Sequence, residues 1–230
     1  MKKLLLATLC TLVMTSSCFS IHYNGNGKSV VCKGPVVEKT LDLADFNAIT
    51  VTGSADMILS QSETFSVKVN ANEEVFEYID FSVENGTLKL KNKDNVQIKA
   101  KTFKVYISLP YLENLLVNGA ADADIHDYAS AKDLTVLVNG AGDFEIVSVK
   151  VPTLSLTVNG AGDIDATGLD VETVSVSVNG AGDVNLSGKA NIANLSVSGA
   201  GDIDAANLEV TEWNVHKSGI ASIRTPTKTN

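Results

Sequence analysis

Five copies of one short segment, (Asn/Ser)-Gly-Ala-(Gly/Ala)-Asp, follow one another between residues 118 and 202. A period near 20 residues, with apolar alternation on both sides of each copy, is typical of stacked coils of parallel β-structure. We therefore predict an all-β fold, a right-handed parallel β-helix (solenoid) with coils of about 20 residues. The copies are spaced by 21, 20, 20 and 19 residues and begin at Asn118, Asn139, Asn159, Asn179 and Ser198.

Apolar residues alternate with polar ones before and after each copy. Alternate side chains of a strand point to opposite faces, so we expect the apolar set to fill the interior of the solenoid. The row Phe144, Ile164, Val184 and Ile203 tests this prediction, because equivalent residues of successive coils should touch. Serine and threonine hold the intervening outward positions before the copies, among them Thr135, Ser155, Thr157, Ser175, Ser177 and Ser196.

The first half of the chain is also strand-like, and we divide the mature chain at residue 112. Residues 35–112 are predicted to form a β-rich part whose segment 52–59 fits the repeat as a degenerate first coil. A hairpin excursion is expected around Asn85-Gly86, a strong signal for a tight turn. Only residues 72–78 suggest a helix, capped by Asn70 or Asn72. Residues 113–225 form the solenoid repeats, and 226–230 form a tail.

The corner segment itself predicts a ladder of side-chain amides. Asn118, Asn139, Asn159 and Asn179 occupy equivalent positions, so their amides should stack about 4.8 Å apart and hydrogen-bond from coil to coil. We expect the glycines to let the chain turn through positive φ, and the alanine between them to point inward.

The fifth and seventh positions of the repeats form two outward columns that hold nine carboxylates. Adjacent unit charges 4.8 Å apart repel by about 0.9 kcal/mol even in bulk water, so this repulsion must be offset. One explanation is that the aspartates accept backbone N–H groups at their corners, as in Asx-turns, with solvent screening the rest. We also expect Arg224 to pair with Asp204 and to end its column. The other explanation is Ca²⁺ bound by Asp122, Asp124, Asp143, Asp163, Asp165, Asp183, Asp202 and Asp204.

Residues 1–18 have the features of a bacterial lipoprotein signal. Lys2 and Lys3 precede an apolar run at residues 4–14, which is too short to span a bilayer, and small residues lead to Cys18. Lipidation of Cys18 predicts an outer-membrane lipoprotein, and ordinary secretory cleavage nearby is the alternative. No acidic cluster follows Cys18, which favours a periplasmic orientation over the cell surface. Residues 19–34 are predicted to be a flexible tether, with order beginning near Pro35.

The net charge and the positions of the titratable groups argue against several classes of function. The net charge is −9, and removal of Lys2 and Lys3 changes it to −11, so a nucleic-acid partner is not expected and membrane contact should come only from the lipid anchor. His22, His126 and His216 do not come together in the repeat frame, so neither a zinc site nor a catalytic triad is predicted. Cys32 is expected to be an inert thiol, and its pairing with Cys18 would require that Cys18 is not acylated.

Three segments in this order resemble a known family: residues 46–56 (FNAITVTGSAD), residues 105–112 (VYISLPYL) and the repeats from Asn118. They resemble the head GIN domain family of autotransporter adhesins, which is frequent in the Bacteroidetes. The resemblance implies a β-helical fold and an envelope location, and it supplies no catalytic residues and no cofactor. The chain shows no translocator domain, so self-export is not expected.

We therefore predict a non-enzymatic cell-envelope lipoprotein, an adhesin-like binding or scaffolding module with repeated polar and acidic faces. The expected partner is a glycan or an envelope protein. The alternative is a β-helical enzyme that cleaves glycans, a polysaccharide lyase or hydrolase, because paired carboxylates can act as acid and base. Here, however, the acids arise from regular repetition, and the lysines form no evident cluster.

Overall fold

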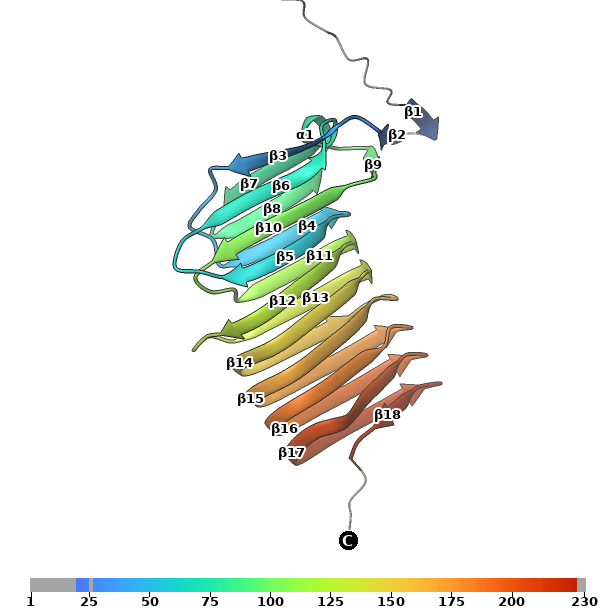
Figure 1. Cartoon of the computed structure of the whole chain (residues 1–230). Coiled ribbons are helices and arrows are strands. Elements are labelled where there is room, and N and C mark those ends of the chain that lie inside the picture. Colours follow the sequence, from blue (N-terminus) through green and yellow to red (C-terminus); the bar gives the residue numbers. More distant parts are fainter. Residues whose placement is uncertain (1–19, 25–26, 227–230) are drawn as a thin grey trace, which may run out of the picture.

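The computed structural model describes residues 20–24 and 27–226, so Cys18 and the signal segment lie outside the described part. Within these ranges the chain is built from strands and one short helix, which form an elongated stack (Figure 1). The elements are β1 (Ser20–Asn24), β2 (Gly27–Cys32), β3 (Val36–Leu41), β4 (Ala48–Gly53), β5 (Asp56–Gln61), β6 (Ser66–Asn72), α1 (Val75–Tyr78), β7 (Ile79–Glu84), β8 (Thr87–Asn92), β9 (Val96–Ala100), β10 (Phe103–Leu109), β11 (Asn114–Ala120), β12 (Asp122–Ala129), β13 (Leu134–Ala141), β14 (Asp143–Val158), β15 (Asp163–Gly180), β16 (Val184–Gly199), β17 (Asp202–Gly219) and β18 (Ser222–Arg224).

The repeats form a β-solenoid, as the sequence predicts. Strands β14 and β15 pair in parallel from Asp143↔Asp163 to Val158↔Val178, a register of 20 residues. The same parallel pairing joins β15 to β16 and β16 to β17. Each of these long strands bends around the stack, so one strand contributes to two sides of a coil (Figure 1).

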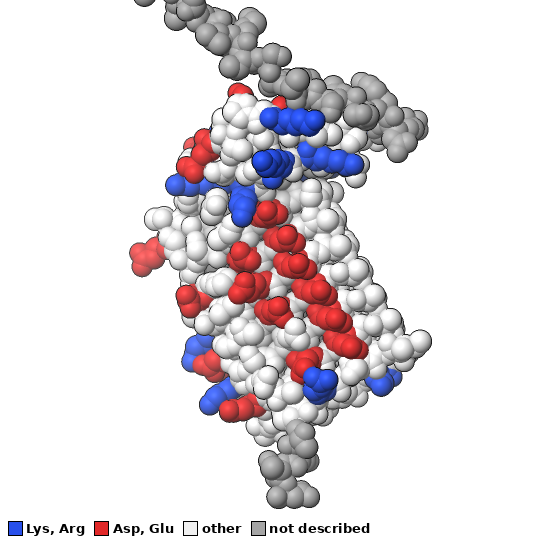
Figure 2. Space-filling view, turned by 45° about the vertical axis from the view of Figure 1, so that its right-hand side comes forward, with Lys and Arg blue, Asp and Glu red and all other residues white. Residues whose placement is uncertain are grey.

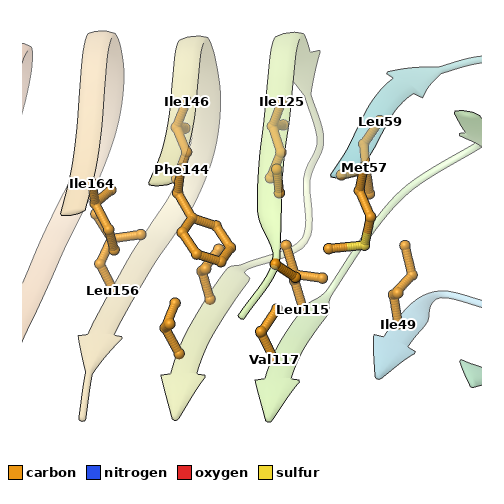
Figure 3. Close-up of a cluster of buried hydrophobic side chains, with 14 of the residues drawn as sticks. Ile49, Met57, Leu59, Leu115, Val117, Ile125, Phe144, Ile146, Leu156 and Ile164 are labelled. Carbon is orange, nitrogen blue, oxygen red and sulfur yellow. The ribbon is translucent and has the colours of Figure 1, made fainter. Parts of the chain in front are cut away.

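The predicted interior row is present. Phe144 pairs with Ile164, Ile164 with Val184, and Val184 with Ile203, and all four side chains are buried. Figure 3 shows Phe144 pointing into the space between the two sides of the coil, toward side chains of the facing strands. Full burial of one such side chain contributes about 1.5–3 kcal/mol, so the row holds successive coils in register.

The degenerate first coil is confirmed. Thr52 pairs with Asn118 through β4 and β11, and Asp56 pairs with Asp122 through β5 and β12. The predicted hairpin joins β7 to β8, and Asn85 and Gly86 have φ values of 52° and 73°. Positive φ at both central residues is the geometry of a tight primed turn.

The excursion also adds a layer that the sequence did not predict. Strand β8 lies parallel on β4 and β10 lies parallel on β5, so these strands continue the stack by one more coil. Strands β7, β6 and β3 then pair antiparallel on this layer. Antiparallel strands close this end of the solenoid and protect edges that would otherwise be open to other chains.

The tether prediction is wrong for the described part of residues 19–34. Strand β2 pairs antiparallel with β1 and parallel with β9, and Val30 and Cys32 are buried. Val30 and Cys32 lie two residues apart and therefore point to the same face of β2, and β9 offers this strand a partner edge. Order therefore begins before Pro35.

The helix is also shorter than expected, and neither asparagine caps it. Strand β6 ends at Asn72, whose amide donates to the Gly34 carbonyl at 2.7 Å and accepts N–H groups of Lys101 and Thr102 at 3.1 and 3.0 Å. These bonds compete with a capping role, because they hold the Asn72 side chain against two other segments. In the described residues, no helix is both long and apolar enough to cross a bilayer.

Candidate functional site

An acidic face runs along the solenoid (Figure 2). The carboxylates of the two columns form diagonal rows on this face, and basic side chains lie near the ends of the rows rather than between them. The columns are outward because the residues between their members, such as Phe144 and Ile164, are buried. The members are Asp122, Asp143, Asp163, Asp183 and Asp202 in the first column, and Asp124, Glu145, Asp165, Asn185 and Asp204 in the second.

The first column is tied to the backbone of the next coil. Asp122 Oδ1 accepts the N–H of Asp143 at 2.9 Å, and Asp163 Oδ1 accepts the N–H of Asp183 at 2.9 Å. Asp183 and Asp202 make equivalent bonds at 3.0 and 2.7 Å. The exception is the N–H of Asp163, which donates to the Gly142 carbonyl.

The Asx-turn prediction is wrong in one respect: each aspartate carboxylate accepts the N–H of a residue in the next coil, and not an N–H of its own corner. A hydrogen bond to a charged group contributes about 1.5–3 kcal/mol, more than the repulsion of about 0.9 kcal/mol between neighbours. The carboxylates therefore connect successive coils. Their regular repetition has a structural reason that needs no bound ion.

The second column is less regular. Asn185 donates to Asp165 at 2.6 Å, and Arg224 donates to Asp204 Oδ2 at 2.7 Å, so the predicted pair at the end of the column is confirmed. Asp124 and Glu145 have no such partner among the described residues. The upper part of this column therefore carries uncompensated negative charge.

A hollow of about 650 Å³ lies over the upper part of both columns, and Asp56 of the first coil and Lys104 border it. Partial burial raises the pKa of Asp56, and the charges of Asp122 and Asp124 raise it further, while Lys104 opposes the shift. The negative charge here is thus dense enough to disfavour ionisation of a neighbouring carboxyl group.

The structure brings together three metal-ligating side chains, of which the sequence predicted only Asp124. The Ca²⁺ hypothesis used eight aspartates of the two columns, but the first column uses carboxylate oxygens for backbone N–H groups. Among the described residues, one group of three metal-ligating side chains forms: Asp124, His126 and Glu145, with ligand atoms within 4.8 Å of one another.

His126 and Glu145 were not predicted as ligands, although the sequence carries a signal for them. His126 follows Asp124 by two positions, so both point outward from β12, and Glu145 is the residue of β14 paired with Asp124. A histidine two residues from an outward aspartate, in register with a glutamate of the next coil, was the signal for this group.

A second, polar face lies on strands β14 to β17. It is a shallow groove lined by serine, threonine and asparagine side chains and by His216. Asn214 donates to Asn194 at 3.1 Å, and Asn194 donates to Ser175 at 3.2 Å. The groove residues repeat from coil to coil: Ser155, Thr157, Ser175, Ser177, Asn194, Ser196, Asn214 and His216.

The predicted amide ladder runs along the corner of the solenoid. Asn139 donates to Asn118 at 2.9 Å, Asn159 to Asn139 at 2.8 Å, and Asn179 to Asn159 at 2.9 Å. The alanine of each corner does not point inward as expected, and Ala161 is exposed. The buried position is one residue later, at Gly162.

The buried cysteine lies away from both faces. Burial raises the pKa of the Cys32 thiol to about 11, and the nearby Glu74 carboxylate adds to the shift. A thiol that stays protonated is a poor nucleophile, which agrees with the prediction of an inert group.

These features define a class: a β-solenoid whose long sides present repeated polar and acidic side chains. The chain belongs to the family described as "Putative auto-transporter adhesin, head GIN domain", which matches residues 45–229. The resemblance predicted from the sequence is thus confirmed. A comparison with curated proteins finds no match.

Solved structures share the fold. A protein of Parabacteroides distasonis described as a putative lipid binding protein is 19% identical, with a TM-score of 0.76 over 86% of this chain and 100% of that one. A putative adhesin of the same species is 22% identical, with a TM-score of 0.76 over 85% and 83% of the two chains. A putative adhesin of Bacteroides fragilis is 19% identical, with a TM-score of 0.67 over 85% and 99%.

Proposed function

We propose that this protein is a non-enzymatic, adhesin-like binding module of the bacterial cell envelope. Membership in the adhesin family supports the envelope location. The signal features of residues 1–18 support a lipid on Cys18 and attachment to the outer membrane, with the solenoid facing the periplasm. The lipid anchor is then the only membrane contact, because an acidic chain is repelled by anionic membrane surfaces.

One observation carries the proposal: the polar face repeats hydroxyl and amide groups at the spacing of the coils. Its members alternate with buried residues such as Val176 and Leu195, so a rigid core fixes their positions. A ligand that itself repeats can then make the same hydrogen bonds on several coils. Groups held in place before binding lose little conformational freedom when the ligand arrives.

A glycan chain is the ligand that this face fits best. Sugar hydroxyl groups both donate and accept hydrogen bonds, as do the side chains of Ser155, Ser177 and Asn194. The face carries no carboxylate among its lining residues, so it would not repel an acidic glycan directly. An envelope protein is the other partner class that the test below can reveal.

The test is a glycan-array screen followed by solution binding and a hydrolysis assay on every hit. Ser177→Arg places a long charged side chain in the middle of the groove and should abolish binding. Thr211→Arg is the matched control, because Thr211 is exposed and lies outside the groove, and it should bind as the wild type does.

Binding without turnover supports the module. Turnover of a bound glycan would favour the enzyme alternative, and equal binding by both variants would place the contact surface elsewhere. If no glycan binds, cross-linking in intact cells should capture an envelope protein through the same face. Protease shaving of intact cells tests the orientation, and cleavage would overturn the periplasmic assignment.

A further inference from the structure

His126 interrupts a column of otherwise non-titratable residues. In the paired register it lies beside Val147, and Val147 lies beside Thr167, so the later coils carry no imidazole at this position. Glu145 is likewise the one glutamate in a column whose other members are aspartates and Asn185. Both departures from the repeat fall at the same place on the surface, beside Asp124.

The three side chains converge because the backbone holds them together. Asp124 and His126 point outward from β12, while Ala123 and Ile125 between and beside them are buried. Asp124 and Glu145 are direct partners in the parallel pairing of β12 and β14. A ligand atom of each residue lies within 4.8 Å of the other two, and small side-chain rotations bring such atoms to one ion.

The charge around this group favours a cation. Neither Asp124 nor Glu145 forms an ion pair with a described lysine or arginine, and Asp122 and Asp143 lie in the adjoining column. Lys104 borders the same hollow, where its charge lowers the pKa of Asp56. His126 adds an imidazole nitrogen, a common metal ligand, to the two carboxylates.

We propose that Asp124, His126 and Glu145 bind one divalent transition-metal ion, of which Zn²⁺ is the representative. Two carboxylate oxygens and one imidazole nitrogen suit Zn²⁺, Co²⁺ or Ni²⁺, whereas Ca²⁺ and Mg²⁺ prefer oxygen ligands alone. Three protein ligands leave coordination positions open to water or to a group of a partner molecule. The site therefore differs from the Ca²⁺ site that the sequence suggested, which consisted of aspartates alone and shares only Asp124 with it.

The test is calorimetric titration of the untagged mature chain with ZnCl₂, together with Co²⁺ absorption spectroscopy. The wild type should bind one ion, and Co²⁺ should give ligand-field bands that change when the imidazole is removed. His126→Ala and Glu145→Gln should each weaken binding by about tenfold or more. Circular dichroism should show that both variants keep the wild-type spectrum, because both side chains are exposed.

Two matched controls make the result specific. Asp165→Asn changes the same column one coil further on, where Thr167 replaces the imidazole, and it should bind Zn²⁺ as the wild type does. His216→Ala removes the histidine of the polar face and should also leave binding unchanged. An absence of Zn²⁺ heat, or binding that survives His126→Ala, would overturn the proposal.

Discussion

Replacement of Gly160 by alanine tests why every corner of the solenoid has glycine after its first residue. A Cβ at Gly160 would lie 2.0 Å from the carbonyl oxygen of Gly140 in the preceding coil. The same clash, with distances of 1.9 to 2.3 Å, arises at Gly119, Gly140, Gly180, Gly199 and Gly219. Gly160 does not have the left-handed φ of some other corner glycines, so the close approach of two backbones is the cause here, and not the positive φ that we predicted.

The cost follows from the contact distance. A carbon atom and a carbonyl oxygen normally stay about 3.3 Å or more apart, so the two coils must separate by more than about 1 Å. The neighbouring bonds between these two coils, Ala161 N–H to Gly140 O at 2.9 Å and Asn159 N–H to Val138 O at 2.7 Å, would then exceed hydrogen-bonding distance. Two lost hydrogen bonds and the steric strain together should destabilise the protein by about 2–5 kcal/mol.

Thermal denaturation followed by circular dichroism measures this cost. For a chain of this length the expected loss in Tm is roughly 4–20 °C. Ala161→Ser is the matched control in the same corner, because Ala161 is exposed, and it should change stability by less than about 0.5 kcal/mol.

A second variant separates close approach from general crowding. Gly162→Ala would place its Cβ 2.9 Å from the Gly142 oxygen, a milder contact, and alanine already occupies the equivalent position at Ala121. It should therefore cost less than Gly160→Ala. If Gly160→Ala melts at the same temperature as the wild type, the explanation is refuted. It is also refuted if Gly162→Ala melts at a lower temperature than Gly160→Ala.

Three further predictions follow from buried or partly buried groups. Tyr128→Phe should destabilise the protein by about 1–3 kcal/mol in urea denaturation, because the Tyr128 hydroxyl is buried and bonds both the N–H and the carbonyl of Leu112 at 2.8 and 2.9 Å; an unchanged midpoint would contradict this. The Cys32 thiol, with its raised pKa, should resist alkylation at about pH 8 until denaturant is added, in a chain whose signal-segment cysteines are replaced, and rapid native labelling would argue against its burial. The pKa of Asp56 is raised in the folded state, so stability is lost as pH rises from the unfolded pKa to the folded one; Asp56→Asn should be more stable than the wild type near pH 7 but not near pH 3, and an equal gain at both would exclude this cause.

The repeating part of the molecule could be predicted from the repeat period. A coil of about 20 residues must return to the same point of the stack, so the period alone sets which residues lie above one another. Strand alternation then separates Phe144, which is buried, from Asp143, which is outward. The amide ladder of Asn118 to Asn179 and the Arg224–Asp204 pair follow from the same register.

The closure of the stack and the meeting points of its irregular side chains could not be predicted, because they depend on contacts between distant segments. The added layer of β8 and β10, and the pairing of β2 with β9, join segments that no local period relates. The contacts of individual side chains could not be predicted either. Asp122 accepts a hydrogen bond from the next coil and not from its own turn, and His126 lies close to Glu145 of a neighbouring strand. Periodicity gives a residue its place in the register, whereas its contacts depend on the packing of distant segments and on the directions that their side chains take.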